Sequence, residues 1–318
     1  MKKINVFVDG HEGTTGLQIN ERLESRKDVE VIKISSDLRK NLDARKACIN
    51  SADVVFLCLP DDAAKEAAAL VENDKTIIID ASTAHRTDSN WTYGLPEISP
   101  EQRDCISKSK RIANPGCHAT GFISAIYPLV KKGIIPAEYP LTCHSITGYS
   151  GGGKKLIEKF QNKCGLGYEL VSPQIYSTTL QHKHIPEMMK VCGLKYAPVF
   201  TPIVANFERG MSVVIPLAIR LFNRKIFAKD ICDFLGSYYA NEEFIKIMPM
   251  EEGVCLNNGF LGAQACNGTN RLELCVSGHS EQALIVARLD NLGKGASGAA
   301  IQNMNIALGL RQAAGLTR

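Results

Sequence analysis

The sequence predicts an α/β protein of two domains, in which a doubly wound parallel sheet is followed by an α+β domain with a largely antiparallel sheet. Apolar strand-like runs alternate with helix-like runs through the N-terminal part of the chain, which is the pattern of parallel β–α–β units. Later strand-like runs follow one another with few helices between them. The 318 residues are enough for two hydrophobic cores.

The elements of the first domain are expected in alternating order. They are strand Ile4–Val8, helix Leu17–Ser25, strands Val29–Ile34 and Asp53–Leu59, an alanine-rich helix Asp61–Val71, and strand Thr76–Asp80. Because strands joined through helices run parallel and are covered on both faces, this order predicts a doubly wound sheet.

A glycine-rich turn between the first strand and the first helix indicates a dinucleotide site. Gly10, Gly13 and Gly16 are spaced G-x-x-G-x-x-G, and Thr14 and Thr15 lie between the last two. Glycines at such a turn let backbone N–H groups approach a pyrophosphate at the start of a helix. Together with the strand order, the turn predicts a Rossmann-type domain.

The end of the second strand is expected to meet the adenosine ribose. Ser35, Ser36 and Arg39 offer hydrogen bonds and charge to the 2′-phosphate of NADP, whereas Asp37 favours the free 2′-hydroxyl of NAD. We expect NADP, because the hydroxyls follow the strand directly and Arg39 is joined by a second cation, Lys40. A solvated polar loop is the alternative interpretation.

One of the 11 cysteines stands at a position suited to a nucleophile. Pro115 and Gly116 bend the chain just before Cys117, and the residues from His118 to Val130 are apolar at helical spacing. The free N–H groups and the positive end of a helix lower a thiol pKa. The sequence therefore predicts a reactive Cys117, against the alternative of a buried structural thiol. On a helix, His118 is expected to project away from Cys117 and to serve packing or orientation.

The second domain is expected to begin at Cys117. Its strands are predicted at Leu141–Ser150, Ala197–Ala205, Met211–Leu221, Arg271–Ser277 and Ala283–Arg288, with a helix at Ala228–Tyr239 and a final helix at Gly295–Ala314. A glycine run after Tyr149 and Ser150 either approaches a ligand or forms a flexible loop, and these two residues are predicted to face substrate.

Composition excludes several classes of protein. The formal net charge of +4 is small and dispersed, so we expect no nucleic acid or membrane partner, while a small anion fits. No signal pattern or long apolar segment occurs in the sequence, which predicts a cytoplasmic protein. The odd cysteine count without a C-x-x-C pair argues against a disulfide framework or a zinc knuckle. His182 and His184 form an H-x-H pair, but no third residue with ligand spacing stands near them, so no metal is expected.

Four motifs together resemble a known family. They are Asp80-Ala-Ser-Thr-Ala-His-Arg86, Asn114-Pro-Gly-Cys117, Gln181-His-Lys-His-Ile-Pro-Glu187 and Asp290-Asn-Leu-Gly-Lys-Gly-Ala-Ser-Gly298. In this order and spacing the chain resembles the semialdehyde dehydrogenases that reduce acyl phosphates, and within them the short-form N-acetyl-gamma-glutamyl-phosphate reductases. The resemblance covers essentially the whole chain.

The resemblance implies an NADPH-dependent acyl-phosphate reductase of arginine biosynthesis that works through a cysteine thioester. It implies His184, or next His182, as the acid/base partner of Cys117, and Arg86 as the phosphate anchor, with Lys183 and Arg209 as weaker candidates. Further expected substrate residues are Asn114, which would help to stabilise oxyanions, and Glu187, and further cofactor residues are Pro60, Ser82, Asn291 and Gly295. The final helix is expected to return to the first domain, giving an NADP-binding domain of residues 1–116 and 294–318 and a catalytic domain of residues 117–293, in a homo-oligomer, either dimer or tetramer.

Two alternatives stay open. Aspartyl phosphate or an aminoadipyl analogue is a possible substrate, because pocket size is not legible from sequence and one methylene discriminates weakly. A non-catalytic dinucleotide sensor that kept the fold is the alternative from another class, and it predicts an unreactive Cys117.

Overall fold

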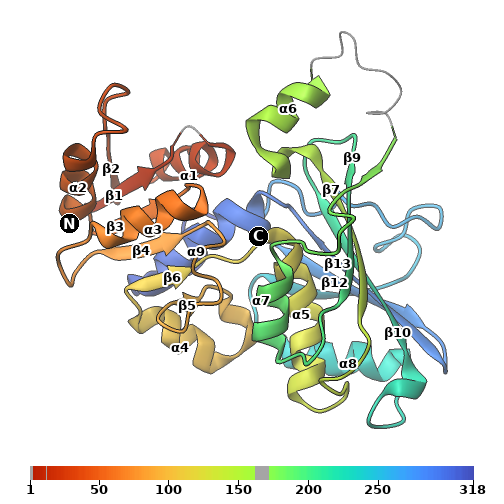
Figure 1. Cartoon of the computed structure of the whole chain (residues 1–318). Helices are drawn as coiled ribbons and strands as arrows, with labels where there is room; N and C mark the ends of the chain where they lie inside the picture. The colour runs from red at the N-terminus through yellow and green to blue at the C-terminus, as the bar shows by residue number, and fades with distance from the viewer. Residues whose placement is uncertain (1–2, 12, 162–171) are drawn as a thin grey trace. The chain divides into compact units, whose positions relative to one another are not determined.

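Contacts within the chain divide it into two compact units. The computed structural model describes residues 3–11, 13–161 and 172–318 (Figure 1). One unit consists of Met1–Gly116 with Ala296–Thr317, and the other of Cys117–Gly295 with Arg318. The division therefore falls between Gly116 and Cys117, directly before the expected nucleophile.

A parallel sheet of six strands forms the centre of the first unit. Its order is β2-β1-β3-β4-β6-β5, and every described pairing is parallel. The strands are β1 (Ile4–Asp9), β2 (Val29–Ile32), β3 (Val54–Leu57), β4 (Ile77–Asp80), β5 (Thr92–Tyr93) and β6 (Arg111–Ala113). The four residues of β3 are all fully buried, as expected for a strand covered on both faces.

Helices cover both faces of this sheet, which confirms the doubly wound fold. The helices are α1 (Thr14–Glu24), α2 (Leu42–Ser51), α3 (Asp61–Ala69), α4 (Pro100–Lys108) and α9 (Gly298–Ala307), with a 3₁₀ turn η1 (Pro96–Ile98). Ile19 of α1, Ile106 of α4 and Ile301 of α9 belong to one apolar cluster. Ile49 of α2 and Ala64 of α3 belong to a second cluster on the opposite face.

The structure adds elements that the sequence pattern did not indicate. These are α2, α4, β5 and β6. Helix α2 shows weak amphipathic patterning, with only Arg45 and Ile49 buried, so its apolar periodicity is not visible. The last helix was also predicted too long, because α9 ends at Ala307 and Gly309 then adopts a positive φ of 68°.

The second unit contains a mixed sheet of seven strands in the order β11-β12-β13-β10-β7-β9-β8. The strands are β7 (Thr142–Gly148), β8 (Gln174–Ile175), β9 (Val199–Ala205), β10 (Met211–Ala218), β11 (Ile245–Pro249), β12 (Leu272–Gly278) and β13 (Gln282–Leu289). Two of its pairings, β7 with β9 and β11 with β12, are parallel and the others are antiparallel. The expectation of a largely antiparallel sheet is thus confirmed, while β8 and β11 were not predicted.

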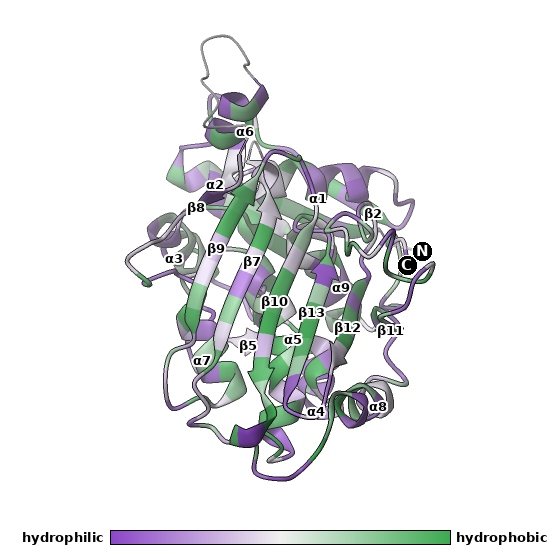
Figure 2. Ribbon diagram, turned by 90° about the vertical axis from the view of Figure 1, so that its right-hand side faces the viewer, coloured by the Kyte–Doolittle hydropathy of each residue, from purple (hydrophilic) through white to green (hydrophobic). Residues whose placement is uncertain are grey.

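The helices of this unit are α5 (Cys117–Lys131), α6 (Gly153–Gln161), α7 (Ile185–Cys192) and α8 (Ala228–Tyr238). Short turns occur at η2 (Tyr149–Gly152), η4 (Ile219–Leu221) and η5 (Gly293–Ser297). Of these helices, α5 and α8 pack on the second sheet, while α7 packs on α5, and α6 packs on η2. Helix α5 contacts β10 and β13, and α8 contacts β11, β12 and β13. Figure 2 looks onto the opposite face, where no helix lies in front of β7, β9 and β10.

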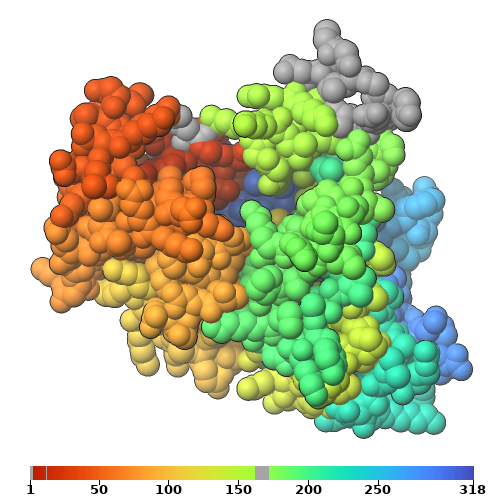
Figure 3. All heavy atoms as spheres, in the orientation of Figure 1, coloured from red at the N-terminus to blue at the C-terminus, as the bar shows by residue number. Residues whose placement is uncertain are grey.

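Helix α5 is the buried centre of the second unit. Eleven of its 15 residues are buried, and it packs against α7 as well as the sheet. In the orientation of Figures 1 and 3, α7 lies in front of α5 and covers much of it. The long apolar run after Cys117 therefore folds as predicted and holds that residue at the rim of the core. None of the described helices is long and apolar enough to cross a membrane.

Candidate active site

The start of α5 presents Cys117 as the sequence predicts. Strand β6 ends at Ala113, the backbone N–H of Asn114 donates to Asp80 O (2.8 Å), and Pro115 and Gly116 lead into the helix. Cys117 is the first residue of α5, and it is a half-buried free thiol. The N–H groups of a helix's first turn and its dipole stabilise a thiolate at this position.

Gly295 packs closely against Cys117. A Cβ atom placed on Gly295 would lie 2.7 Å from the Cβ of Cys117 and 3.2 Å from Asp290 O. Only glycine fits against Cys117 here. The sequence predicts Gly295 as a cofactor residue, and the contact that the structure describes for it is with Cys117.

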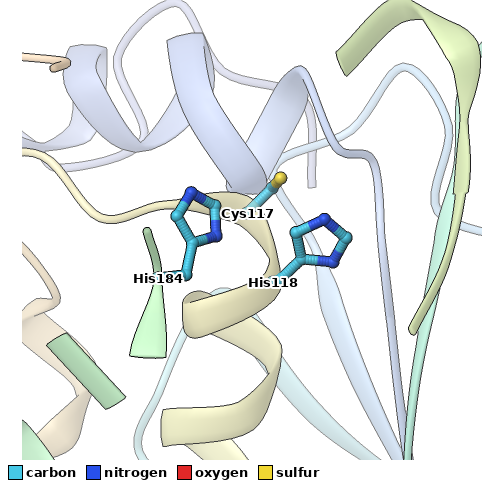
Figure 4. A group of neighbouring side chains, drawn as sticks. All are labelled: Cys117, His118 and His184. Carbon is cyan, nitrogen blue, oxygen red and sulfur yellow. The ribbon is translucent and has the colours of Figure 1, made fainter. Parts of the chain in front are cut away.

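Three side chains converge at the start of α5. The Sγ atom of Cys117 and one ring nitrogen each of His118 and His184 all lie within 4.8 Å of one another. Figure 4 shows the two imidazole rings on either side of Cys117. The ring of His182 lies 4.7 Å from that of His184 and 5.4 Å from that of His118. Both predicted acid/base candidates are therefore in this cluster, with His184 in the group that includes Cys117.

The expectation that His118 points away from Cys117 is wrong. Its Nδ1 lies 2.7 Å from Ser145 Oγ and its Nε2 lies 2.9 Å from Tyr176 Oη, so strand β7 and the segment after β8 hold the ring beside the nucleophile. Burial, with smaller contributions from the charges of His182 and Lys183, lowers the pKa of His118 to about 3. His118 is therefore neutral near pH 7.

The cluster brings together three side chains that could bind a metal, a combination that spacing in the sequence did not reveal. Cys117, His118 and His184 could each offer one ligand atom. However, both ring nitrogens of His118 are already within hydrogen-bond distance of hydroxyl groups. A metal ion would have to displace Ser145 or Tyr176, so the geometry favours a hydrogen-bonded site over a metal centre.

The histidine segment is ordered by its own backbone. The N–H of His184 donates to Nδ1 of His182 (3.1 Å), which places the proton of a neutral His182 on Nε2. His184 is the N-cap of α7, so Ile185 is the first helical residue and Pro186 the second. Glu187 lies in the first turn of α7 and is 1% exposed.

Arg86 and Asn114 brace the turn within the first unit. The Nε of Arg86 donates to Asn114 O (2.9 Å), and its Nη2 donates to Ala81 O (3.0 Å). The side-chain amide of Asn114 donates to Ala296 O (3.0 Å) and accepts from Asn303 Nδ2 (3.1 Å). These hydrogen bonds hold the turn that carries Cys117, a task that the sequence did not predict for either residue.

The loop after β4 is held by a buried carboxylate. Asp80 accepts from the backbone N–H (2.9 Å) and the hydroxyl (2.7 Å) of Ser82, and lies 2.7 Å from Nδ1 of His85. The ring of His85 stacks on Trp91 with centroids 3.9 Å apart. Ser82, predicted to bind the cofactor, has its hydroxyl turned to Asp80.

The glycine turn of the first unit has the close packing that a dinucleotide loop requires. Gly10 has a φ of 88°, and a Cβ there would lie 2.3 Å from Cys58 O. A Cβ on Gly16 would lie 2.4 Å from Gly10 O, while Gly13 is the N-cap of α1. Thr14 and Thr15 begin α1, and the buried Oγ1 of Thr14 has no hydrogen-bond partner among the described residues. The turn thus fits a pyrophosphate group at the start of α1.

The predicted ribose loop lies at the surface. Ser35, Ser36 and Arg39 are exposed, and the Ser35 hydroxyl hydrogen-bonds Asp37, which lowers the pKa of Asp37. Pro60 is the exposed N-cap of α3. The charged and hydroxyl groups expected to recognise the ribose are therefore all at positions accessible to a ligand.

The predicted substrate residues of the second unit lie in a region braced by hydrogen bonds. The ring of Tyr149 stacks on Phe160, with centroids 4.9 Å apart. Ser150 Oγ accepts from Asn291 Nδ2 (3.0 Å), and Asn291 Oδ1 accepts from the N–H of Gly210 (2.9 Å). Ser150 and Asn291, 141 residues apart in sequence, thus stabilise each other.

Two polar residues within hydrogen-bond distance of His118 were missed by sequence reasoning. Ser145 is fully buried on β7, and Tyr176 follows β8. They lie 27 and 58 residues from His118 in sequence, and neither belongs to a recognisable motif. Only the pairing of β7 and β9 and of β9 and β8 brings their segments together.

A dinucleotide-type fold followed by a helix-borne cysteine among histidines defines an NAD(P)-linked oxidoreductase with a cysteine nucleophile. Residues 5–105 match the family model described as semialdehyde dehydrogenase, NAD binding domain, and residues 117–291 match its dimerisation domain. The chain therefore belongs to the semialdehyde dehydrogenase family.

Relatives and solved structures extend this finding. The chain is 45% identical to N-acetyl-gamma-glutamyl-phosphate reductase 2 of Nostoc sp., over 99% of this chain and 100% of that protein. It is 42% identical to N-acetyl-gamma-glutamyl-phosphate reductase 2 of Pseudomonas putida, over 98% of each. The structure of aspartate semialdehyde dehydrogenase II from Vibrio cholerae has a TM-score of 0.72 at 15% identity, over 97% of this chain and 99% of that chain. At that identity the likeness shows the shared fold alone.

Proposed function

We propose that this protein reduces N-acetyl-gamma-glutamyl phosphate to N-acetylglutamate semialdehyde and phosphate with NADPH, a step of arginine biosynthesis. The observation that carries the proposal is Cys117 at the first position of α5 with a ring nitrogen of His184 within 4.8 Å of its sulfur. Relatives at 45% and 42% identity over nearly their full length bear the name of this activity, which supports the choice of substrate.

Cys117 acts as a covalent nucleophile. The thiolate attacks the γ-carbonyl carbon, the carbon–oxygen bond to phosphate breaks, and a thioester remains on the sulfur. Transfer of a hydride equivalent to that carbonyl gives a thiohemiacetal, and breaking its carbon–sulfur bond releases the aldehyde and the thiolate. His184 acts as the general acid and general base for the thiohemiacetal hydroxyl. The ordinary pKa of histidine suits both the donation and the acceptance of this proton.

The start of α5 stabilises the oxyanions. Backbone N–H groups in the first turn of a helix have no intrahelical partner and can face the developing negative charge. Asn114 fixes the turn that carries these groups through its bonds to Ala296 and Asn303, so its contribution to oxyanion stabilisation includes holding their position.

NADPH supplies the hydride when it is bound to the first unit. Gly10, Gly13 and Gly16, with Thr14 and Thr15, would hold the pyrophosphate. Ser35, Ser36 and Arg39 would hold the 2′-phosphate, and a solved Candida albicans aspartate semialdehyde dehydrogenase is described with NADP. Further cofactor contacts are proposed for Pro60, Ser82, Asn291 and Gly295, of which Ser82 and Asn291 have the hydrogen bonds described above.

The phosphoryl group of the substrate needs a cation. We assign Arg86 to it, because a guanidinium has five N–H donors and can bind an anion while bracing Asn114 O. Lys183 is exposed beside the histidine cluster, and Arg209 is half-exposed beside Glu208, so both remain weaker candidates. Tyr149, Ser150 and Glu187 are proposed to contact the rest of the substrate.

The assembly is proposed to be a homo-oligomer, either dimer or tetramer. Residues 117–291 match a domain described as a dimerisation domain, and the sheet carries exposed Val199 and Pro216 and half-buried Leu284 on neighbouring strands. The ten described cysteines are all free thiols, which suits the cytoplasm proposed as its location. We propose residues 1–116 with 294–318 as the NADP-binding domain and residues 117–293 as the catalytic domain.

The decisive experiment is the reverse reaction. With N-acetylglutamate semialdehyde, phosphate and NADP⁺, the purified protein should form NADPH at a rate that depends on phosphate. Aspartate semialdehyde and the aminoadipate analogue are the control substrates, and NAD⁺ is the control cofactor. A higher kcat/KM with either control substrate would reassign the substrate. Binding of NADP⁺ without turnover, together with an ordinary thiol pKa at Cys117, would show a dinucleotide sensor.

A further inference from the structure

Three side chains from separate segments of the second unit form one chain of hydrogen bonds beside Cys117. Ser145 Oγ lies 2.7 Å from Nδ1 of His118, and Nε2 of the same ring lies 2.9 Å from Tyr176 Oη. Ser145 is 0% exposed and His118 is 3% exposed. The connection between a hydroxyl on β7 and a phenol after β8 therefore runs entirely through a buried imidazole.

The protonation of His118 limits this chain of hydrogen bonds to two possible directions. The ring is neutral near pH 7 and so carries a single N–H. If Ser145 donates to Nδ1, then Nε2–H donates to Tyr176 Oη and leaves the phenol proton for another acceptor. In the opposite direction Tyr176 donates to Nε2, and the ring donates to Ser145.

Among the described residues, Cys117 is a candidate acceptor for the phenol proton. Its sulfur lies within 4.8 Å of a ring nitrogen of His118. Tyr176 Oη lies 2.9 Å from Nε2 of the same ring, so the phenol and the sulfur both lie beside this imidazole. Burial and, after it, the charge of the Cys117 thiolate raise the pKa of Tyr176. A hydrogen bond to an ionised acceptor is roughly twice as strong as one between neutral groups, which favours donation toward the sulfur.

We propose that Ser145, His118 and Tyr176 form a neutral hydrogen-bond relay that stabilises the Cys117 thiolate. Ser145 Oγ–H donates to Nδ1, Nε2–H donates to Tyr176 Oη, and the Tyr176 O–H donates to Cys117 Sγ. Every proton stays on its own heavy atom. Ser145 and His118 are positioning residues, and Tyr176 acts on the reacting sulfur. The catalytic meaning of this relay rests on the proposed function, but its effect on the thiol does not require a substrate.

The other charged groups around the relay have separate positions. His182 and Lys183 act on His118 from the segment before α7, and His184 lies in the Cys117 group from the N-cap of α7. Glu187 is buried in the first turn of that helix. On the glycine side, Lys294 places its Nζ 5.7 Å from the centre of the Phe244 ring, and the Asp290 carboxylate accepts from the N–H groups of Gly268 and Leu292.

The test measures the thiol itself. The rate of iodoacetamide alkylation at Cys117 is followed against pH by peptide mass spectrometry, which separates this cysteine from the others. Tyr176→Phe should raise the apparent pKa of the Cys117 thiol and slow its alkylation at pH 6.5 about tenfold, since one pKa unit corresponds to a tenfold change in ionisation. Ser145→Ala should act in the same direction with a smaller effect.

Two variants separate the relay from simple packing. Tyr139→Phe removes another buried phenol that accepts from the N–H of Ala218 (2.6 Å), and it should leave the Cys117 profile unchanged. Ser145→Thr keeps the hydroxyl and should restore the native profile that Ser145→Ala loses. Melting temperatures of all variants identify any that fail to fold, and the Ser145 pair still decides if Tyr176→Phe is one of them.

An alkylation profile of folded Tyr176→Phe that superimposes on that of the native protein would overturn the relay. Equal profiles for Ser145→Ala and Ser145→Thr would also overturn it. If the profile shifts as expected but the protein reduces no acyl phosphate, the relay stands and the proposed function falls. If the reductase is active and the profile does not respond, the proposed function stands and the relay falls.

Discussion

Cys117 combines two local features that suit a nucleophile. It is the first residue of α5, and a Cβ on Gly295 would lie only 2.7 Å from its own Cβ. The helix terminus lowers the cost of ionising the thiol, while the glycine fixes the position of its Cα–Cβ bond.

Replacing Cys117 by Ser should abolish reductase activity. The hydroxyl is not ionised near pH 7 and cannot form the thioester, so kcat should fall by at least about 10³-fold, as for other covalent nucleophiles. The measurement is steady-state NADPH oxidation with N-acetyl-gamma-glutamyl phosphate. Substantial activity in a folded Cys117→Ser protein would end the covalent mechanism.

Replacing Gly295 by Ala should displace Cys117. The new methyl group would meet the Cys117 Cβ at 2.7 Å, a backbone-anchored atom that can move only with the start of α5. We expect kcat to fall about tenfold or more, because small misplacements of a reacting group carry large costs. Gly236→Ala is the matched control, since its Cβ would meet nothing within 4 Å in α8. Equal kcat values for the two variants would contradict the proposed contact.

The segments that carry the predicted site residues follow the carboxyl ends of three parallel strands. The carboxyl end of β1 leads into the glycine turn, that of β4 into the Asp80 loop, and that of β6 into Cys117. The carboxyl ends of neighbouring parallel strands lie at one edge of a sheet, where ligands of such sheets bind. The buried ion pair between Asp9 and Arg45, 2.9 Å long, further ties the end of β1 to α2.

At the scale of this turn, Gly16→Ala should weaken cofactor binding. Alanine favours a helix by about 1 kcal/mol over glycine, but its Cβ would lie 2.4 Å from Gly10 O. The turn must shift, and we expect the Kd for NADPH to rise about tenfold or more, as measured by fluorescence titration. Gly236→Ala again provides the control with the same change in helix propensity. An unchanged Kd for Gly16→Ala would place the pyrophosphate elsewhere.

At the scale of the whole molecule, His118 links the site to stability. Its pKa is lowered to about 3 by burial, whereas an unfolded histidine titrates near 6.5. Between these values the unfolded state binds a proton that the folded state excludes, so acidification favours unfolding. This group makes the free energy of unfolding fall by up to about 1.4 kcal/mol for each pH unit of acidification.

This linkage predicts a stability profile. The melting temperature of the native protein should fall as the pH decreases from 7 to 5, and the fall should be smaller in His118→Gln, even though that variant is less stable at pH 7. His279→Gln, at an exposed position, should keep the native slope. Parallel profiles for the native and His118→Gln proteins would show that His118 becomes charged in the folded state.

Much of the fold could be predicted from patterns of residues that are close in sequence. The glycine turn, the strands around it and the start of α5 were predicted because each depends on residues adjacent in sequence. Helix α2 was missed, because its buried positions are few and include Arg45, whose burial depends on Asp9 of β1. Strands β8 and β11 were missed for a similar reason, since short edge strands need a neighbouring strand to define them.

The sequence by itself determined the class of fold and the family and predicted Cys117 as the nucleophile, since spacing, periodicity and motif order are properties of neighbouring residues. Only the tertiary structure decided which side chains surround the sulfur. His118 faces Cys117 because Ser145 and Tyr176 hold its two nitrogens, and these partners come from segments 27 and 58 residues away. Hydrogen bonds between distant segments form only after the strands pair, so no local pattern in the chain encodes them.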